Sequence, residues 1–70
     1  METTYTTKEA ARALGMKPAS LVSAIWNDQI KPPKKHGRNY LWLMSDIESA
    51  SWALRRYRQF KRWEEVQVNG

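Results

Sequence analysis

The sequence predicts a small α+β domain that contains three helices and a two-stranded β-hairpin. Its 70 residues suffice for one small domain. Two short helical patterns are separated by a glycine-containing turn, and a proline pair then precedes a basic turn between two extended segments. We expect the domain to cover residues 1–65 and a C-terminal tail to cover residues 66–70.

The first helix is predicted over residues 7–14. Thr6 and Glu9 have the spacing of a capping box, in which each side chain accepts a hydrogen bond from the other residue's backbone amide. Apolar residues recur at helical spacing up to Leu14, and Gly15 suits the left-handed position that ends a helix.

The second helix is predicted to begin at Pro18 and to last until about Asp28. Proline suits the first helical position, because its missing N–H has no partner there. Lys17 occupies the cap position but cannot accept a hydrogen bond, so we expect a weak helix start. The apolar stripe of this helix consists of Leu21, Ala24 and Ile25. Two short helices joined by a three-residue turn are typical of a helix-turn-helix.

The segment after the second helix is predicted to form a β-hairpin with a basic tip. Pro32 and Pro33 stop helical continuation and fix an extended backbone. A polar turn over residues 34–39 and an extended segment over 40–43 follow. We expect Trp42 to pack between this hairpin and the third helix. The fold class is therefore a small winged helix-turn-helix.

The third helix is predicted to begin at Asp46, with Ser45 and Glu48 as a second capping box. Its expected core stripe consists of Ile47, Ala50, Leu54 and Tyr57.

A second face of the same helix is predicted to carry Trp52 and Trp63, which lie within about 20° of each other on a helical wheel. Arg56 lies near both. The pattern fits either two partly exposed tryptophans with Arg56 stacked between them, or an apolar contact for a partner protein or a second copy.

Charge is concentrated in the predicted hairpin. The chain carries a net charge of +5, and residues 31–45 contain four cations and no acid. Such a cluster favours a polyanionic partner, most simply double-stranded DNA, although a merely basic surface is the alternative.

The second helix and the hairpin supply the candidate DNA-binding residues. We expect the hydroxyl and amide side chains of the helix to bond bases or phosphates, the lysines to contact phosphates, and Arg38 to enter a narrow minor groove. The full set is Lys17, Ser20, Val22, Ser23, Trp26, Asn27, Lys31, Lys34, Lys35 and Arg38.

Several functional classes are disfavoured by composition. There is no cysteine, and the single histidine, His36, cannot form a metal site by itself. A chain this short does not surround Tyr57 with the positioned cations that a nucleophilic tyrosine requires. We expect no catalysis, no cofactor and no bound metal. The longest apolar run, residues 40–44, is far below a membrane span, so we expect a cytoplasmic protein with no membrane contact.

Residues 30–42 carry Ile-Lys-Pro-Pro, Lys-His-Gly-Arg and Tyr-Leu-Trp steps. They resemble the winged segment of lambdoid phage excisionases, within the wider MerR-like winged-helix superfamily. The resemblance covers about residues 5–50. It implies a DNA-bending accessory protein that binds cooperatively at a phage attachment site and directs integrase towards excision.

The resemblance also implies site residues. It places Ser20, Ser23 and Trp26 in the major-groove helix and Arg38 in the minor-groove wing. Excisionase recognition helices typically carry arginines at positions where this chain has Val22, Ser23 and Trp26. The region that contacts integrase in that family corresponds here to the basic, aromatic C-terminal helix.

Two other functions remain open from the sequence. One is a small winged-helix transcriptional regulator of a phage or mobile element. The other, from a different class, is a protein-interaction module whose basic surface binds an acidic partner.

Overall fold

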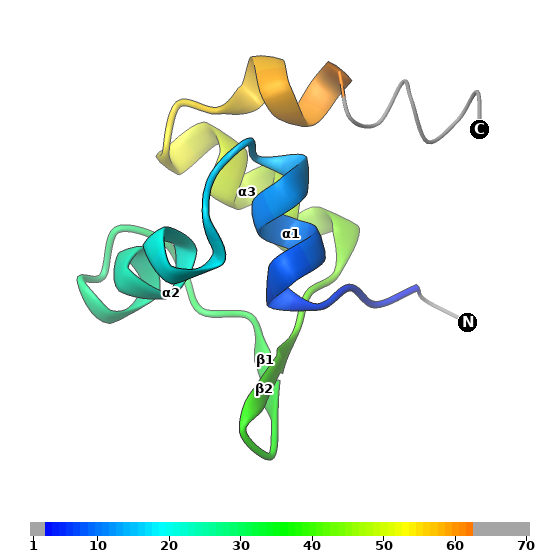
Figure 1. The fold of residues 1–70 in the computed structure, drawn as a ribbon, viewed down its shortest axis with the longest axis vertical. Coiled ribbons are helices and arrows are strands. Elements are labelled where there is room, and N and C mark those ends of the chain that lie inside the picture. Colours follow the sequence, from blue (N-terminus) through cyan, green and yellow to red (C-terminus); the bar gives the residue numbers. More distant parts are fainter. Residues whose placement is uncertain (1–2, 63–70) are drawn as a thin grey trace.

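The computed structural model describes residues 3–62. The elements are α1 (Thr7–Ala13), α2 (Pro18–Trp26), β1 (Lys34–His36), β2 (Asn39–Leu41), α3 (Met44–Ala53) and a final helical segment over 57–62. Figure 1 shows the hairpin at one end of the molecule and the 57–62 segment at the opposite end, with α1 and α3 between them. The predicted winged helix-turn-helix is confirmed.

Helix α1 begins and ends as the sequence predicts. The Glu9 amide donates to Thr6 Oγ1 over 3.1 Å, and the Thr6 amide donates to Glu9 Oε1 over 2.9 Å. Gly15 follows with φ +65°. Its amide and that of Met16 donate back to the carbonyls of Arg12 and Ala11, which closes the last turn of the helix.

Helix α2 also begins at the predicted residue, Pro18, and Lys17 provides no side-chain cap. The helix ends at Trp26, slightly earlier than expected. Asp28 adopts φ +57°, and the Gln29 amide donates to the carbonyl of Ala24. This is the same closing arrangement as at Gly15, formed here without a glycine.

The hairpin has a shorter turn than the sequence suggested. β1 pairs antiparallel with β2, with Lys34 opposite Leu41 and His36 opposite Asn39. Gly37 and Arg38 alone form the loop, and Gly37 has φ +63°, as a tight two-residue turn requires. Lys34 and Lys35 therefore lie in a strand and not in the turn.

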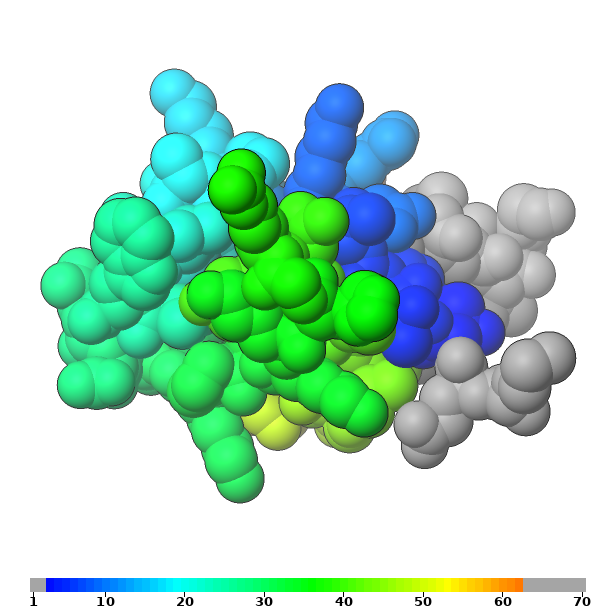
Figure 2. Space-filling model, turned by 90° about the horizontal axis from the view of Figure 1, so that it is seen from below, coloured from blue at the N-terminus to red at the C-terminus, as the bar shows by residue number. Residues whose placement is uncertain are grey.

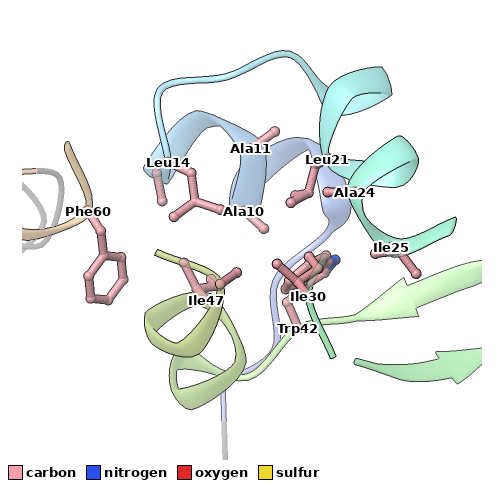
Figure 3. Close-up of a cluster of buried hydrophobic side chains, with 12 residues drawn as sticks. Ala10, Ala11, Leu14, Leu21, Ala24, Ile25, Ile30, Trp42, Ile47 and Phe60 are labelled. Atoms are coloured by element: carbon pink, nitrogen blue, oxygen red, sulfur yellow. The ribbon is translucent and has the colours of Figure 1, made fainter. Parts of the chain in front are cut away.

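Trp42, directly after β2, is completely buried. Its backbone N–H and C=O pair with those of Tyr5 over 2.9 and 2.8 Å, and its indole Nε1 donates to Thr7 Oγ1 over 3.1 Å. Figure 3 shows its ring among Ile30, Ile47 and the side chains of α1 and α2. The base of the hairpin is thus packed against all three helices, whereas the sequence predicted a place for Trp42 between the hairpin and the third helix.

The start of α3 differs from the prediction. The helix begins at Met44, two residues early, and its first amides are not capped by Ser45 and Glu48. Instead the Leu43 amide donates to Asp46 Oδ2 over 2.9 Å. Leu43 has no side-chain acceptor to return a bond, so only half of a capping box is present.

The end of α3 corrects the prediction further, because the helix does not continue to Trp63. It stops at Ala53, and Arg55 adopts φ +56° before the chain re-enters a helix at residue 57. The break rotates the second helical segment. Tyr57, predicted in the core, is 42% exposed, and Phe60 is buried in its place. Trp63 and the tail expected over 66–70 lie outside the described residues.

Replacing Gly15 by alanine is expected to reduce the free energy of unfolding by more than the matched change at Gly37. Both positions have a left-handed backbone, which costs a residue with a Cβ about 1–2 kcal/mol. A Cβ at Gly15 would additionally lie 3.1 Å from Gln59 Cγ, whereas one at Gly37 would meet no atom within 4 Å. Urea unfolding of G15A and G37A measures the difference. Equal losses would show that the contact with Gln59 adds nothing.

Candidate nucleic-acid interface

The hairpin carries positive charge on both of its faces. Lys35 is paired with Tyr40, and its Nζ lies 5.7 Å from the centre of the Tyr40 ring, so both side chains share one face. Lys34 is the neighbouring residue in β1 and therefore projects from the other face. Both lysines are exposed.

The tip of the hairpin is narrow and ends in a cation. Gly37 has open space around it, since no atom outside its immediate neighbours lies within 4 Å of a Cβ built there. Arg38 follows as the second turn residue and is exposed. The outermost point of the hairpin is therefore a small backbone turn that carries one guanidinium.

Helix α2 presents a neutral outer face. Leu21, Ala24 and Ile25 are buried against the core, and the helix contains no charged residue. Trp26 lies on the opposite side and is 76% exposed. Of the other side chains predicted to face DNA from this helix and its cap, Val22 is half-buried and the following are exposed: Ser20, Ser23 and Asn27.

The core fixes α2 beside the hairpin. Ile25 of α2, Ile30 of the connecting loop and Trp42 belong to one buried cluster, and Figure 3 shows them gathered at the base of the hairpin. Seen from the hairpin end, the side chains of the hairpin and of α2 lie next to each other on one face (Figure 2). The exposed cations Lys17 and Lys31 flank α2 along the chain.

A family model for the helix-turn-helix domain matches residues 4–50. The chain belongs to the helix-turn-helix domain family. No curated protein and no solved structure matches the chain. No helix within residues 3–62 is long and apolar enough to cross a membrane.

Membership in the helix-turn-helix family indicates that the protein binds DNA. The matched segment contains α1, α2, the hairpin and most of α3, so all ten candidate DNA-binding residues lie within it. The contacts of these residues with DNA, to bases or to phosphates, stay predictions.

The C-terminal part of this helix-turn-helix protein contains a feature that the sequence did not indicate. The rings of Trp52 and Tyr57 stack, with centroids 4.9 Å apart and planes inclined by 23°. Both rings line a pocket of about 360 Å³ with Phe60 and Lys61. Because Tyr57 was assigned to a continuous helix core, the stack was missed.

Arg56, which one interpretation of the sequence places between Trp52 and Trp63, makes a contact that the sequence did not predict. Its Nη1 donates to the carbonyl oxygen of Gly15 over 2.9 Å and so joins the turn of the helix-turn-helix to the C-terminal segment. The partner of Trp52 is Tyr57. Trp63, the third residue of the proposed partner surface, is outside the described residues.

The affinity for duplex DNA is expected to fall steeply with salt concentration. Five cations lie in the hairpin or beside α2. If each neutralises one phosphate, the plot of log association constant against log salt concentration has a slope of about −4.5. These five are Lys17, Lys31, Lys34, Lys35 and Arg38. Fluorescence anisotropy at several salt concentrations measures the slope.

A matched pair of double variants locates the contacts. Lys34→Ala with Lys35→Ala is expected to reduce the magnitude of the slope by about 2. Arg58→Ala with Lys61→Ala removes the same charge from the opposite end of the molecule and is expected to leave the slope unchanged. A flat salt response of the native protein contradicts the electrostatic account, and equal effects of both double variants contradict the assignment to the hairpin.

Proposed function

We propose that this helix-turn-helix protein is an excisionase-like DNA-binding and DNA-bending accessory protein that directs a phage integrase towards excision. The observation that carries the proposal is the hairpin with cations on both faces, held beside a neutral helix. The resemblance of residues 30–42 to the winged segment of lambdoid excisionases supports it.

The hairpin suits a groove bounded by phosphates on both sides. Lys34 and Lys35 project from opposite faces of the β-ribbon, so a hairpin inserted between two phosphate rows presents one cation to each. The Arg38 side chain at the tip then reaches the base edges at the bottom of the groove. A narrow A·T-rich minor groove has enhanced negative potential, which favours an inserted arginine.

Helix α2 occupies the adjacent major groove in this arrangement. Its nine residues span about 14 Å, a length that the major groove accepts. Because Ile25 and Trp42 hold helix and hairpin in one core, the spacing between the two elements is fixed. The duplex therefore adapts to the protein, and the additional contacts offset the cost of bending.

The aromatic pair Trp52 and Tyr57 is our candidate contact for the recombinase. Tyr57 opens the 57–62 segment, which lies at the end of the molecule remote from the hairpin (Figure 1), and Trp52 stacks on Tyr57. We expect the pair to stay accessible when DNA covers the hairpin face. Trp52 is 62% exposed, which is a large apolar area for a small domain. The exposed cations Arg58 and Lys61 suit a partner that carries carboxylates beside an apolar anchor.

Cooperative loading and bending test the proposed role. Fragments carrying one or several adjacent copies of a site selected from random duplexes are compared by gel shift and by circular permutation. We expect successive copies to fill cooperatively and each complex to migrate as strongly bent DNA. In a reconstituted reaction, addition of the protein is expected to shift the cognate integrase from integration to excision.

A single unbent complex, together with no effect on the direction of recombination, would contradict the excisionase role. A single unbent complex on promoter DNA would favour the small winged-helix transcriptional regulator. A complete lack of DNA binding, with retained binding to an acidic protein, would favour the interaction module.

Trp52→Ala is expected to leave the DNA affinity within about twofold of the native value and to reduce excision by the integrase, because it removes the centre of the proposed partner contact. Trp26→Ala, at another exposed tryptophan, serves as the matched control and is expected to weaken DNA binding itself. DNA affinity is measured by anisotropy and excision by product yield. Unchanged excision with W52A would exclude this surface as the recombinase contact.

A further inference from the structure

We propose that α2 recognises A·T base pairs through the 5-methyl group of thymine, with Trp26 and Val22 as the methyl-contacting side chains. The proposal rests on the proposed DNA-binding function and deepens it, because it names the base edge that the helix reads. It also separates the task of α2 from that of the hairpin.

The first argument is the position of Trp26. On a helical wheel it lies within about 60° of Ala19 and Ser23, at the centre of the side facing away from the buried stripe. With 76% of its surface exposed, the indole is the most exposed large apolar side chain among residues 3–62. Val22, one turn earlier, is half-buried at the margin of this face. Together they form an apolar ridge where the helix would face base edges.

The second argument is what α2 lacks. Guanine is recognised most often by the two donors of an arginine or by a lysine, which reach O6 and N7 in the major groove. Residues 18–26 contain neither, and the nearest cations along the chain, Lys17 and Lys31, lie outside the two ends of the helix. The helix therefore lacks the two side chains that most often read guanine.

The third argument is chemical complementarity. The 5-methyl of thymine is the apolar group that an unmodified base pair exposes in the major groove, so an apolar ridge distinguishes thymine from every other base there. Asn27 follows Trp26 and is exposed, and an asparagine amide matches the N6 and N7 atoms of adenine. Both features favour the same base pair.

The test replaces thymine by uracil, which removes the methyl group and leaves base pairing intact. Two duplexes of the same A·T-rich sequence, each of about two helical turns, are synthesised with thymidine or with deoxyuridine. We expect the native protein to bind the thymine duplex more tightly by about fourfold for each methyl group that it covers. Anisotropy titration measures both affinities.

Single variants assign the effect to side chains. Trp26→Ala is expected to remove most of the preference for thymine over uracil, and Val22→Ala part of it. Trp52→Ala is the matched control for loss of an exposed tryptophan and should keep the full preference. Arg38→Ala controls for a change of minor-groove shape caused by uracil, and it should weaken binding to both duplexes while keeping the preference.

Equal affinity of the native protein for the two duplexes would overturn the inference. A preference that is retained in W26A but lost in R38A would also overturn it, because the hairpin would then be the reader. Failure to bind either duplex, at any salt concentration tested, would contradict DNA binding itself and with it the proposed function. Because Trp26 is exposed, we expect W26A to have the same midpoint temperature of thermal unfolding as the native protein, and circular dichroism measures both.

Discussion

The burial of the Trp42 indole is the constraint on which the arrangement of this domain depends. Its backbone pairs with Tyr5, its Nε1 donates to Thr7, and its ring packs with Ile30 and Ile47 in the core. The hairpin itself has only three residues in each strand, and such a short ribbon is marginally stable in isolation. Anchoring the residue that follows β2 turns this ribbon into a projection with a defined direction.

This anchoring allows the molecule to divide its surface into regions of different chemistry. The hairpin carries the cations Lys34, Lys35 and Arg38, and in the proposed function its two lysines contact phosphates, which carry no base sequence. Helix α2 is uncharged and presents hydroxyl, amide and aromatic groups, which are suited to base edges. The Trp52–Tyr57 stack belongs to a third region, beyond the segment that matches the helix-turn-helix family. The proposed function thus assigns binding strength, base recognition and partner contact to separate parts of a very small chain.

The sequence predicted the starts of helices better than their ends, and the reason is local chemistry. Thr6, Glu9 and Pro18 are residue types with strong positional preferences, and α1 and α2 begin where these residues require. Helices α1, α2 and α3 end with the same pair of backbone hydrogen bonds and one left-handed residue. Only at Gly15 is that residue a glycine. The ends at Asp28 and Arg55 carried no such signal.

The missed break at Arg55 accounts for the errors at the C-terminal end. A continuous helix places Tyr57 in the core, whereas the observed rotation buries Phe60. The positions of the apolar residues gave a weak indication of the break, since Phe60 does not continue the helical stripe of Ile47 and Ala50. At the candidate interface, the helical periodicity of residues 18–26 correctly predicted which side of α2 is buried and which side is exposed. Lys34 and Lys35 face opposite sides because both lie in β1, whereas the sequence analysis placed them in a longer turn.

The contact between Trp42 and Thr7 also bears on the order in which the chain folds. The α1–α2 pair and the hairpin each consist of neighbours in sequence, and local units of this kind form in microseconds. The Trp42–Thr7 hydrogen bond joins residues 35 positions apart, and closing such a loop carries an entropic cost that local contacts avoid. Docking of the indole therefore joins the α1–α2 pair to the hairpin at a larger entropic cost than the local contacts within either unit.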